Sequence, residues 1–191
     1  MTSLLGSTAL VTGASRGIGR AVARRLTADG VLVAVHYGSN KAAARETVHL
    51  IEADGGRAFP VRAELGVPGD VDTLFAALEA GACSRGPARL DILVNNAAIT
   101  ADSIETITQE AFDRLIAVNA VAPGPTVTDM NPWMLDNPEV QRAVGSGNAI
   151  PRAGQPADIA DVAPFLASES GRWVTGQIID ASGGCFLGPR M

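Results

Sequence analysis

The stretch TGASRGIG at residues 12–19 decides the fold, because it places glycines in the turn between an apolar run and an amphipathic segment. The run Thr8–Val11 before it is typical of a buried β-strand, and Gly17–Ala28 after it has apolar residues at helical spacing. Glycines in such a turn let the backbone approach a pyrophosphate, and the helix start offers N–H groups and a positive dipole end. The spacing is GxxxGxG, and a purely structural turn is the alternative to a dinucleotide-binding one.

The rest of the chain repeats this alternation, which is typical of a parallel sheet with helices on both faces. We predict an α/β fold, a Rossmann-type doubly wound parallel sheet of about six strands. No repeat, low-complexity tract or linker divides the chain, so residues 1–191 are expected to form one domain. The further predicted strands are Val31–Tyr37, Ala58–Arg62, Leu90–Asn95 and Thr175–Ala181, and the further predicted helices are Lys41–Ala53, Val71–Ala82 and Ala157–Ala167.

The composition argues against several classes of partner. The net charge of −5 and the pI near 5.0 give no basic footprint, which argues against nucleic acid. We find neither an apolar run of about 18 residues that could span a membrane nor the pattern of a signal peptide at the start, so we expect a cytoplasmic protein. Cys83 and Cys185 are too few for a disulfide framework and are expected to be reduced.

Three later motifs complete a recognisable order: NNAA at 95–98, PGPTVTDM at 123–130 and TGQIIDASGG at 175–184. Together with the glycine-rich turn, they resemble the short-chain dehydrogenase/reductase family, and in particular its acyl-carrier-protein-type ketoreductases. The resemblance runs from about residue 5 to residue 187, apart from one gap. It implies an oxidoreductase that acts on a small-molecule carbonyl and binds a nicotinamide cofactor.

The resemblance also implies which residues hold that cofactor. Those implied for the phosphates are Gly13, Ser15, Arg16, Gly17, Ile18 and Gly19. The other implied positions are Ala63 and Glu64 beside the adenine, Asn95 and Ala97 beside the ribose, and Pro123, Gly124, Thr126 and Thr128 at the nicotinamide amide. Glu64 stands where the family usually has Asp, and Ala98 where it prefers Gly.

The residues after the second predicted strand favour NADP over NAD. An NAD site places a carboxylate there for the ribose 2′-hydroxyl, whereas an NADP site needs a cation for the 2′-phosphate. The stretch HYGSNK at 36–41 has no carboxylate, and Arg16 lies in the phosphate turn. We therefore add Tyr37, Ser39 and Lys41 to the candidate NADP site, with ordinary surface charges as the alternative for Arg16 and Lys41.

The family's catalytic segment has no counterpart in this sequence. The family uses a tyrosine as proton donor, a lysine four residues later that lowers its pKa, and a serine that polarises the carbonyl. Here FDRLIAVN at 112–119 resembles the family's fourth helix, and AVAPG at 120–124 follows at once and resembles its sixth strand. More than one βα unit would lie between them. No catalytic residue is secure, and Asn119 is the one candidate, because the tripeptide VNA at 118–120 fits either side of the gap.

Tyr37 and Lys41 have the spacing of the catalytic pair and are the chain's one tyrosine and one lysine. They follow the second predicted strand, at the adenine end of the site, whereas a proton donor must lie within about 3 Å of the reacting oxygen. We therefore do not assign them to catalysis. His36 and His49 have no metal-binding spacing and are expected to cap or pack.

Three hypotheses for the function follow. The first is an NADP-dependent carbonyl reductase scaffold whose catalytic segment is lost, so that cofactor binding survives and turnover does not. The second is a nucleotide-binding pseudoenzyme or an oligomerising regulatory module. The third is a full-length active reductase whose sequence record is incomplete. The apolar segment 131–150 is either a substrate lid or a contact with another subunit, since the family commonly forms homo-oligomers.

The junction itself carries a structural prediction. We expect Ala117–Ala122 to form a strand, since Val118 and Val121 are β-branched and Pro123 disfavours helical geometry before it. The preceding helix would shorten to Thr108–Ile116, capped by Thr108. The strands would then follow the order 3-2-1-4-5-6, because one crossover unit can be removed without changing the handedness of the sheet. The shortened helix would leave an apolar patch that alters the family dimer or promotes aggregation.

Overall fold

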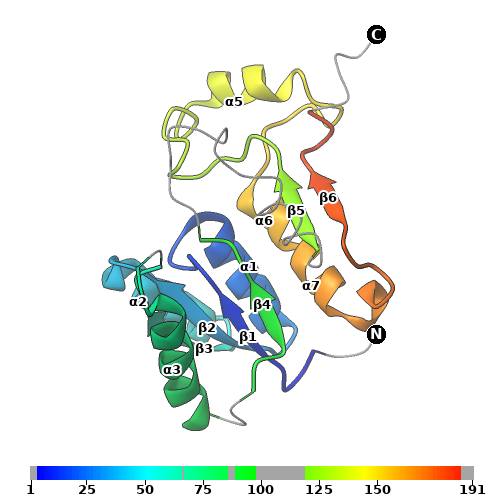
Figure 1. Cartoon of the computed structure of the whole chain (residues 1–191). Helices are drawn as coiled ribbons and strands as arrows, with labels where there is room; N and C mark the ends of the chain where they lie inside the picture. The colour runs from blue at the N-terminus through cyan, green and yellow to red at the C-terminus, as the bar shows by residue number, and fades with distance from the viewer. Residues whose placement is uncertain (1–3, 66, 86–88, 98–118, 186–191) are drawn as a thin grey trace. The chain divides into compact units, whose positions relative to one another are not determined.

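The computed structural model describes residues 4–65, 67–85, 89–97 and 119–185. The chain forms two compact units, unit 1 (Met1–Ala98) and unit 2 (Ile99–Met191), and each is described by itself (Figure 1). Our expectation that the whole chain folds as one domain stays a prediction. Among the described helices, none is long and apolar enough to cross a membrane.

Unit 1 is built on a four-stranded parallel sheet in the order β3-β2-β1-β4, as predicted. Its strands are β1 (Thr8–Val11), β2 (Leu32–Tyr37), β3 (Arg57–Arg62) and β4 (Ile92–Val94). Every residue of β1 and β2 is buried, because these central strands are covered on both faces. Leu10 of β1 stands in register with Ala34 of β2 and Leu93 of β4, so the carboxyl ends of the strands meet at one edge.

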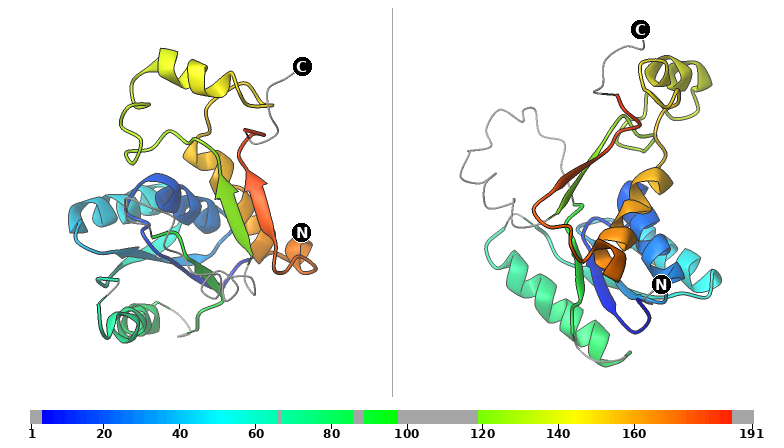
Figure 2. Two further views of the ribbon diagram at one scale, coloured as in Figure 1. Left: turned by 45° about the horizontal axis from the view of Figure 1, so that its top comes forward. Right: turned by 90° about the vertical axis from the view of Figure 1, so that its right-hand side faces the viewer.

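Three helices cover the two faces of this sheet (Figure 2). Helices α1 (Gly17–Ala28) and α2 (Lys41–Ala53) lie on one face and have the predicted bounds. Helix α3 (Asp70–Cys83) lies on the other face, where its buried residues Leu74 and Leu78 join a cluster with Leu10, Leu32 and Phe59. This packing fixes the turns between strands and helices at the carboxyl edge of the sheet.

Unit 2 contains a two-stranded parallel sheet of β5 (Ala120–Pro123) and β6 (Ile178–Ala181), with Val121 beside Ile179. The predicted strand after the junction is thus present from residue 120, while residues 117–118 and the predicted helix 108–116 lie outside the described residues. The six described strands are paired as β3-β2-β1-β4 in unit 1 and as β5-β6 in unit 2, and the pairing of β4 with β5 in the expected order stays a prediction. The crossover that would join β4 to β5 falls in 98–118, which is outside the described residues.

The remaining helices of unit 2 correct two predictions. The predicted helix Ala157–Ala167 is divided into α6 (Pro156–Ala160) and α7 (Val162–Ala167). Pro164 explains the division, since it has no N–H for the carbonyl of Ala160 and its ring crowds that carbonyl. The segment 131–150, expected only as an apolar loop, contains helix α5 (Pro138–Gly145). A short 3₁₀ helix, η2 (Glu169–Gly171), follows α7.

Candidate cofactor site

The glycine-rich turn between β1 and α1 is shaped for close approach. Gly13 and Gly17 have φ values of 62° and 56°, a left-handed conformation that glycine adopts without strain. A Cβ on Gly13 would lie 2.9 Å from the Cα of Ala97, and a Cβ on Gly19 would lie 2.5 Å from Nδ2 of Asn96. The turn therefore needs glycine at positions 13 and 19. It leads into the start of α1, where the first N–H groups have no partner within the helix.

Thr12 and Asn96 bind the turn to the end of β4. The N–H groups of Asn96 and Ala97 both donate to Oγ1 of Thr12, each at 2.9 Å. Nδ2 of Asn96 donates to the carbonyl oxygen of Thr12 at 2.9 Å and contacts that of Gly13 at 3.3 Å. Of the implied ribose residues, Ala97 is thus held by its backbone, whereas Asn95 is exposed. Asn96, which the sequence did not single out, orders this part of the site.

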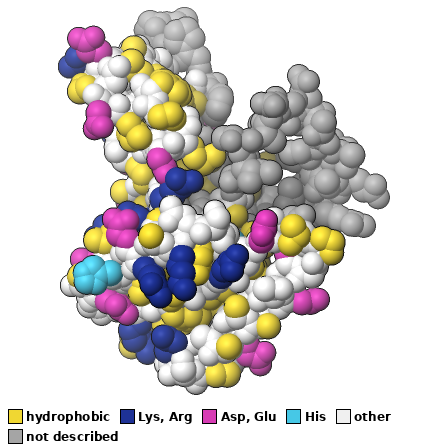
Figure 3. All heavy atoms as spheres, turned by 90° about the vertical axis from the view of Figure 1, so that its left-hand side faces the viewer, with side chains coloured by type: hydrophobic (Ala, Val, Ile, Leu, Met, Phe, Trp, Pro, Cys, Tyr) yellow, Lys and Arg dark blue, Asp and Glu magenta, His cyan; other side chains and the backbone are white. Residues whose placement is uncertain are grey.

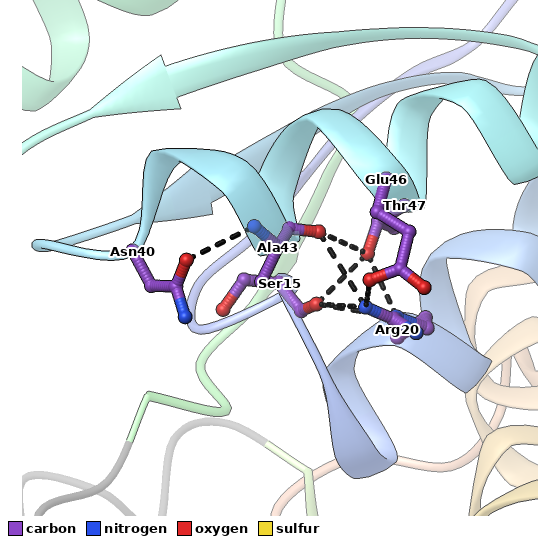
Figure 4. A network of polar contacts seen from close by, with 6 residues as sticks. All are labelled: Ser15, Arg20, Asn40, Ala43, Glu46 and Thr47. Atoms are coloured by element: carbon purple, nitrogen blue, oxygen red, sulfur yellow. Dashed lines mark hydrogen bonds and ion pairs between the residues drawn. The ribbon is translucent and has the colours of Figure 1, made fainter.

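A second network ties the turn to α2 (Figure 4). Nε and Nη2 of Arg20 donate to the carbonyl oxygen of Ser15 at 3.2 and 2.8 Å, and Oγ1 of Thr47 donates to the same oxygen at 2.9 Å. Arg20 also donates to Glu46 of α2 at 2.9 Å. The phosphate turn and the helix that follows the predicted 2′-phosphate position are therefore joined through Arg20.

The residues predicted for the 2′-phosphate lie where β2 passes into α2. Tyr37 ends β2 and is buried, whereas Ser39 and Lys41 are exposed. Oδ1 of Asn40 accepts the N–H of Ala43 at 3.0 Å and so caps α2. Lys41 and Arg45 of α2 are exposed one helical turn apart. Figure 3 shows several basic side chains, with acidic ones around them, on one face of unit 1. The exposed cation of Lys41 at this end of the site suits an anionic ligand.

The residues implied for the adenine follow β3. Ala63 is buried, and its N–H donates to the carbonyl oxygen of Tyr37 at 3.2 Å. Glu64 is exposed. The ring of His36 lies between this segment and the phosphate turn, with Nδ1 accepting the N–H of Gly13 at 3.1 Å and Nε2 lying 3.1 Å from the carbonyl oxygen of Ala63.

Unit 2 carries the loop implied for the nicotinamide, directly after β5. Gly124 approaches β6 so closely that a Cβ there would lie 2.7 Å from the carbonyl oxygen of Ser182. Thr126 is buried, its Oγ1 donates to the carbonyl oxygen of Gly124 at 2.8 Å, and its own carbonyl accepts Nδ2 of Asn131 at 3.0 Å. Thr128 is also buried, and Pro123 closes the strand beside Ala181. The four residues thus form one ordered loop.

Asn119, the one catalytic candidate, directly precedes β5, and its side chain binds two backbone groups. Its Nδ2 donates to the carbonyl oxygen of Val174 at 2.8 Å, and its Oδ1 accepts the N–H of Gln177 at 3.1 Å. Both ends of the amide therefore hold the turn before β6, and the catalytic role of Asn119 stays a prediction. Among the described residues, no group of three or more His, Cys, Asp or Glu side chains could hold a metal ion.

Several residues that order the site were not assigned to it from the sequence: Thr12, Arg20, His36, Thr47 and Asn96. Their partners lie 5 to 85 residues away along the chain, so most of these contacts exist only after folding. The signal that was available is the place of Thr12 and Asn96 at the ends of two adjacent parallel strands, which meet at one edge.

Comparison with known proteins identifies the family. The model of the short-chain dehydrogenases matches residues 7–143, and the model described as enoyl-(acyl carrier protein) reductase matches residues 113–185. This chain therefore belongs to the short-chain dehydrogenase family and has its Rossmann-type fold. Its relatives are oxidoreductases, and the family acts on small molecules.

Three individual proteins illustrate the likeness. The 3-oxoacyl-[acyl-carrier-protein] reductase of Staphylococcus aureus is 29% identical over 247 aligned positions, covering 94% of this chain and 98% of that protein. The promiscuous reductase LugOII is 41% identical with a TM-score of 0.87, covering 98% of this chain and 100% of that one. The angucycline C-6 ketoreductase LanV, solved with bound NADP, is 40% identical with a TM-score of 0.82, covering 97% of this chain and 98% of that one.

Proposed function

We propose that this chain is an NADP(H)-binding member of its family that lacks the Ser/Tyr-x-x-x-Lys machinery and so reduces carbonyls weakly or not at all. The observation that carries the proposal is the glycine-rich turn, held open by Thr12, Asn96 and Arg20 around the residues implied for the phosphates. These residues fit a dinucleotide, because Gly13 and Gly17 adopt positive φ values in a turn that leads into the N-terminus of α1, where backbone N–H groups bind phosphate.

NADP is favoured over NAD by the charges at the end of β2. The segment 36–41 contains no carboxylate, Lys41 is exposed, and Arg16 stands at the start of α1. A carboxylate at this position would repel a 2′-phosphate, whereas cations bind it. The bound NADP of LanV, a relative 40% identical, supports the same choice.

The loss of activity is supported by the residues that remain. When bound, NADPH supplies a hydride to a carbonyl, and the protein must supply the proton and polarise the oxygen. The chain's one tyrosine, Tyr37, is buried at the end of β2, and its one lysine, Lys41, begins α2. The alignment with the Staphylococcus reductase runs over 247 positions although this chain has 191 residues, so at least fifty positions lie opposite gaps. A lost internal segment accounts for both observations.

The candidate site supports cofactor binding without chemistry, as in a nucleotide-binding pseudoenzyme or regulatory module. We propose a cytoplasmic location and a homo-oligomer altered by the missing segment.

The intact mass of the protein distinguishes the third hypothesis, a full-length reductase with an incomplete sequence record, from the other two. A mass of 19.6 kDa contradicts it, and a mass several kilodaltons larger would replace our proposal.

Turnover tests the proposal. Loss of a general acid removes a factor of about 10²–10⁴, and loss of the positioning groups removes more. With a β-ketoacyl thioester as substrate and intact mass verified, we expect no NADPH oxidation above the rate without protein. A rate of order 1–10³ per second, ordinary for an enzyme, would contradict the proposed loss of the catalytic machinery.

A further inference from the structure

His36 joins the phosphate turn to the adenine side of the site through backbone groups. Its Nδ1 accepts the N–H of Gly13, its Nε2 lies against the carbonyl oxygen of Ala63, and both distances are 3.1 Å. Its own carbonyl oxygen accepts the N–H of Ala14 at 2.9 Å. The residue is 2% exposed, so water does not substitute for these partners. One side chain therefore spans two segments of the candidate site.

The partners fix the protonation state of the ring. A backbone N–H can only donate, so Nδ1 is an unprotonated acceptor, and a carbonyl oxygen can only accept, so Nε2 carries the hydrogen. Burial lowers the pKa of His36 from its ordinary value, against the opposing effect of the Ala63 hydrogen bond. The imidazole is therefore neutral at pH 7 in the tautomer that both partners need.

The elements packed around the ring of His36 carry both apolar and charged residues. On this face of the sheet, β2 packs against apolar residues such as Leu10, Val61 and Leu74. The charged residues of the surrounding segments are Arg16 in the turn, Arg57 and Arg62 in β3, Glu64 after it, and Asp70, Asp72 and Glu79 in α3. None of these charges is among the causes that lower the pKa of His36. The state of the ring thus depends on burial and on its two backbone partners.

We propose that neutral His36 is a positioning residue of the cofactor site, which sets the spacing between the phosphate turn and the adenine segment and releases the turn when protonated. The inference rests on the proposed function. Protonation would place an N–H on Nδ1 opposite the N–H of Gly13, so two donors would face each other and the hydrogen bond would be lost. NADPH binding therefore weakens in acid, because the protonated ring no longer holds the phosphate turn in place.

Nitrogen NMR of the unliganded protein tests the protonation state directly. The chain has two histidines, and the spectrum of His49→Leu, which changes an exposed residue of α2, assigns the His36 signals. We expect the Nε2–H tautomer for His36 and a titration midpoint below the ordinary histidine value of 6.5. The Nδ1–H tautomer, or a midpoint at or above that value, would overturn the inference whatever the protein binds.

Variants test the positioning role. His36→Leu should weaken NADPH binding about tenfold or more and speed hydrogen exchange at the Gly13 amide, whereas His36→Asn, which keeps a donor and an acceptor, should retain part of both. His49→Leu is the control and should change neither. As pH falls below the ordinary histidine value of 6.5, NADPH affinity should fall more for wild type than for His36→Asn, where the 2′-phosphate of the cofactor still titrates.

The outcomes separate this inference from the proposed function. If His36→Leu binds NADPH within twofold of wild type and keeps Gly13 protected, His36 does not position the turn. If wild type binds no NADPH but His36→Leu alone exposes the Gly13 amide, the proposed function fails while positioning of the turn by His36 is supported. Should His36→Leu not fold, His36→Asn and the NMR titration decide.

Discussion

Units 1 and 2 differ in how completely the described residues bury their apolar side chains. In unit 2 the buried apolar residues are Met134, Ala153, Ile159, Ala160 and Pro164, and all the others lie in unit 1. Both units expose large apolar side chains, and those of unit 2 are Met130, Trp133, Leu135, Ile150, Phe165, Trp173 and Ile178. The half that holds the glycine-rich turn thus carries a core of its own. The other half has little core among the described residues, as we expect if the lost segment belonged there.

Replacing one phenylalanine in each unit should give the largest difference in lost stability between the two units. Phe59 is 2% exposed in the core of unit 1, and Phe165 is 43% exposed in unit 2. We expect Phe59→Ala to lower the free energy of unfolding by about 3–5 kcal/mol and Phe165→Ala by less than about 1 kcal/mol. Urea denaturation followed by far-UV circular dichroism measures both. Equal losses would contradict the comparison.

The same denaturation tests the expectation of one domain. Both tryptophans, Trp133 and Trp173, lie in unit 2, so their fluorescence reports that unit, whereas circular dichroism reports the whole chain. One domain predicts coincident midpoints. A fluorescence transition at lower urea would show that unit 2 unfolds separately.

Replacing one glycine in each unit with alanine should give a smaller difference in lost stability. A Cβ at Gly19 would lie 2.5 Å from both Nδ2 of Asn96 and the carbonyl oxygen of Gly13, whereas a Cβ at Gly147 would meet nothing within 4 Å. Gly19→Ala should cost about 1–3 kcal/mol of stability and weaken NADPH binding more than tenfold, despite the higher helix propensity of alanine. Gly147→Ala in unit 2 should stay within about 0.5 kcal/mol and leave binding unchanged. Tight NADPH binding by Gly19→Ala would show that the turn does not hold the phosphates.

The smallest expected effect is the loss of Tm when one ion-paired aspartate is replaced, and it should be equal in the two units. Asp91 accepts the N–H of Thr8 at 2.9 Å and pairs with Arg89, and Asp158 accepts the N–H of Gln155 at 2.7 Å and pairs with Arg152. In each case the arginine hydrogen bond is the main cause that lowers the carboxyl pKa below its ordinary 3.8.

Both carboxylates therefore stabilise the fold above that value, and the contribution is lost as pH falls through the folded pKa. Changing either aspartate to asparagine should lower Tm by no more than about 2–4 °C at pH 7, because exposed pairs contribute little. In acid, variant and wild type should converge. A difference that persists at about pH 2 would assign the effect to packing or hydrogen bonding instead of charge.

Local signals account for what the sequence predicted well. The bounds of α1 and α2 followed from helical periodicity and from the glycines at 30 and 55, which have positive φ. The signals for α5 were also present, since Asn137 caps it and Pro138 opens it, but an apolar loop was assumed there. Pro164 likewise marked the break between α6 and α7.

The contacts that order the site could not be predicted in this way. Arg20 reaches Glu46 and His36 reaches Gly13 across more than twenty residues of chain, and the geometry that permits this comes from the packed sheet. A histidine beside a strand end has no periodicity that distinguishes packing from positioning. The sequence predicted which segments contribute to the candidate site, and the structure adds which side chains hold the segments of unit 1 together.

The central claim is that a cofactor site for NADP persists in a chain without its catalytic segment. Fluorescence titration of the intact 19.6 kDa protein with NADPH and with NADH tests it most directly. The account predicts saturable binding of NADPH at least about tenfold tighter than that of NADH, a difference of about 1.4 kcal/mol. Equal affinities, a preference for NADH, or no binding of either would contradict it.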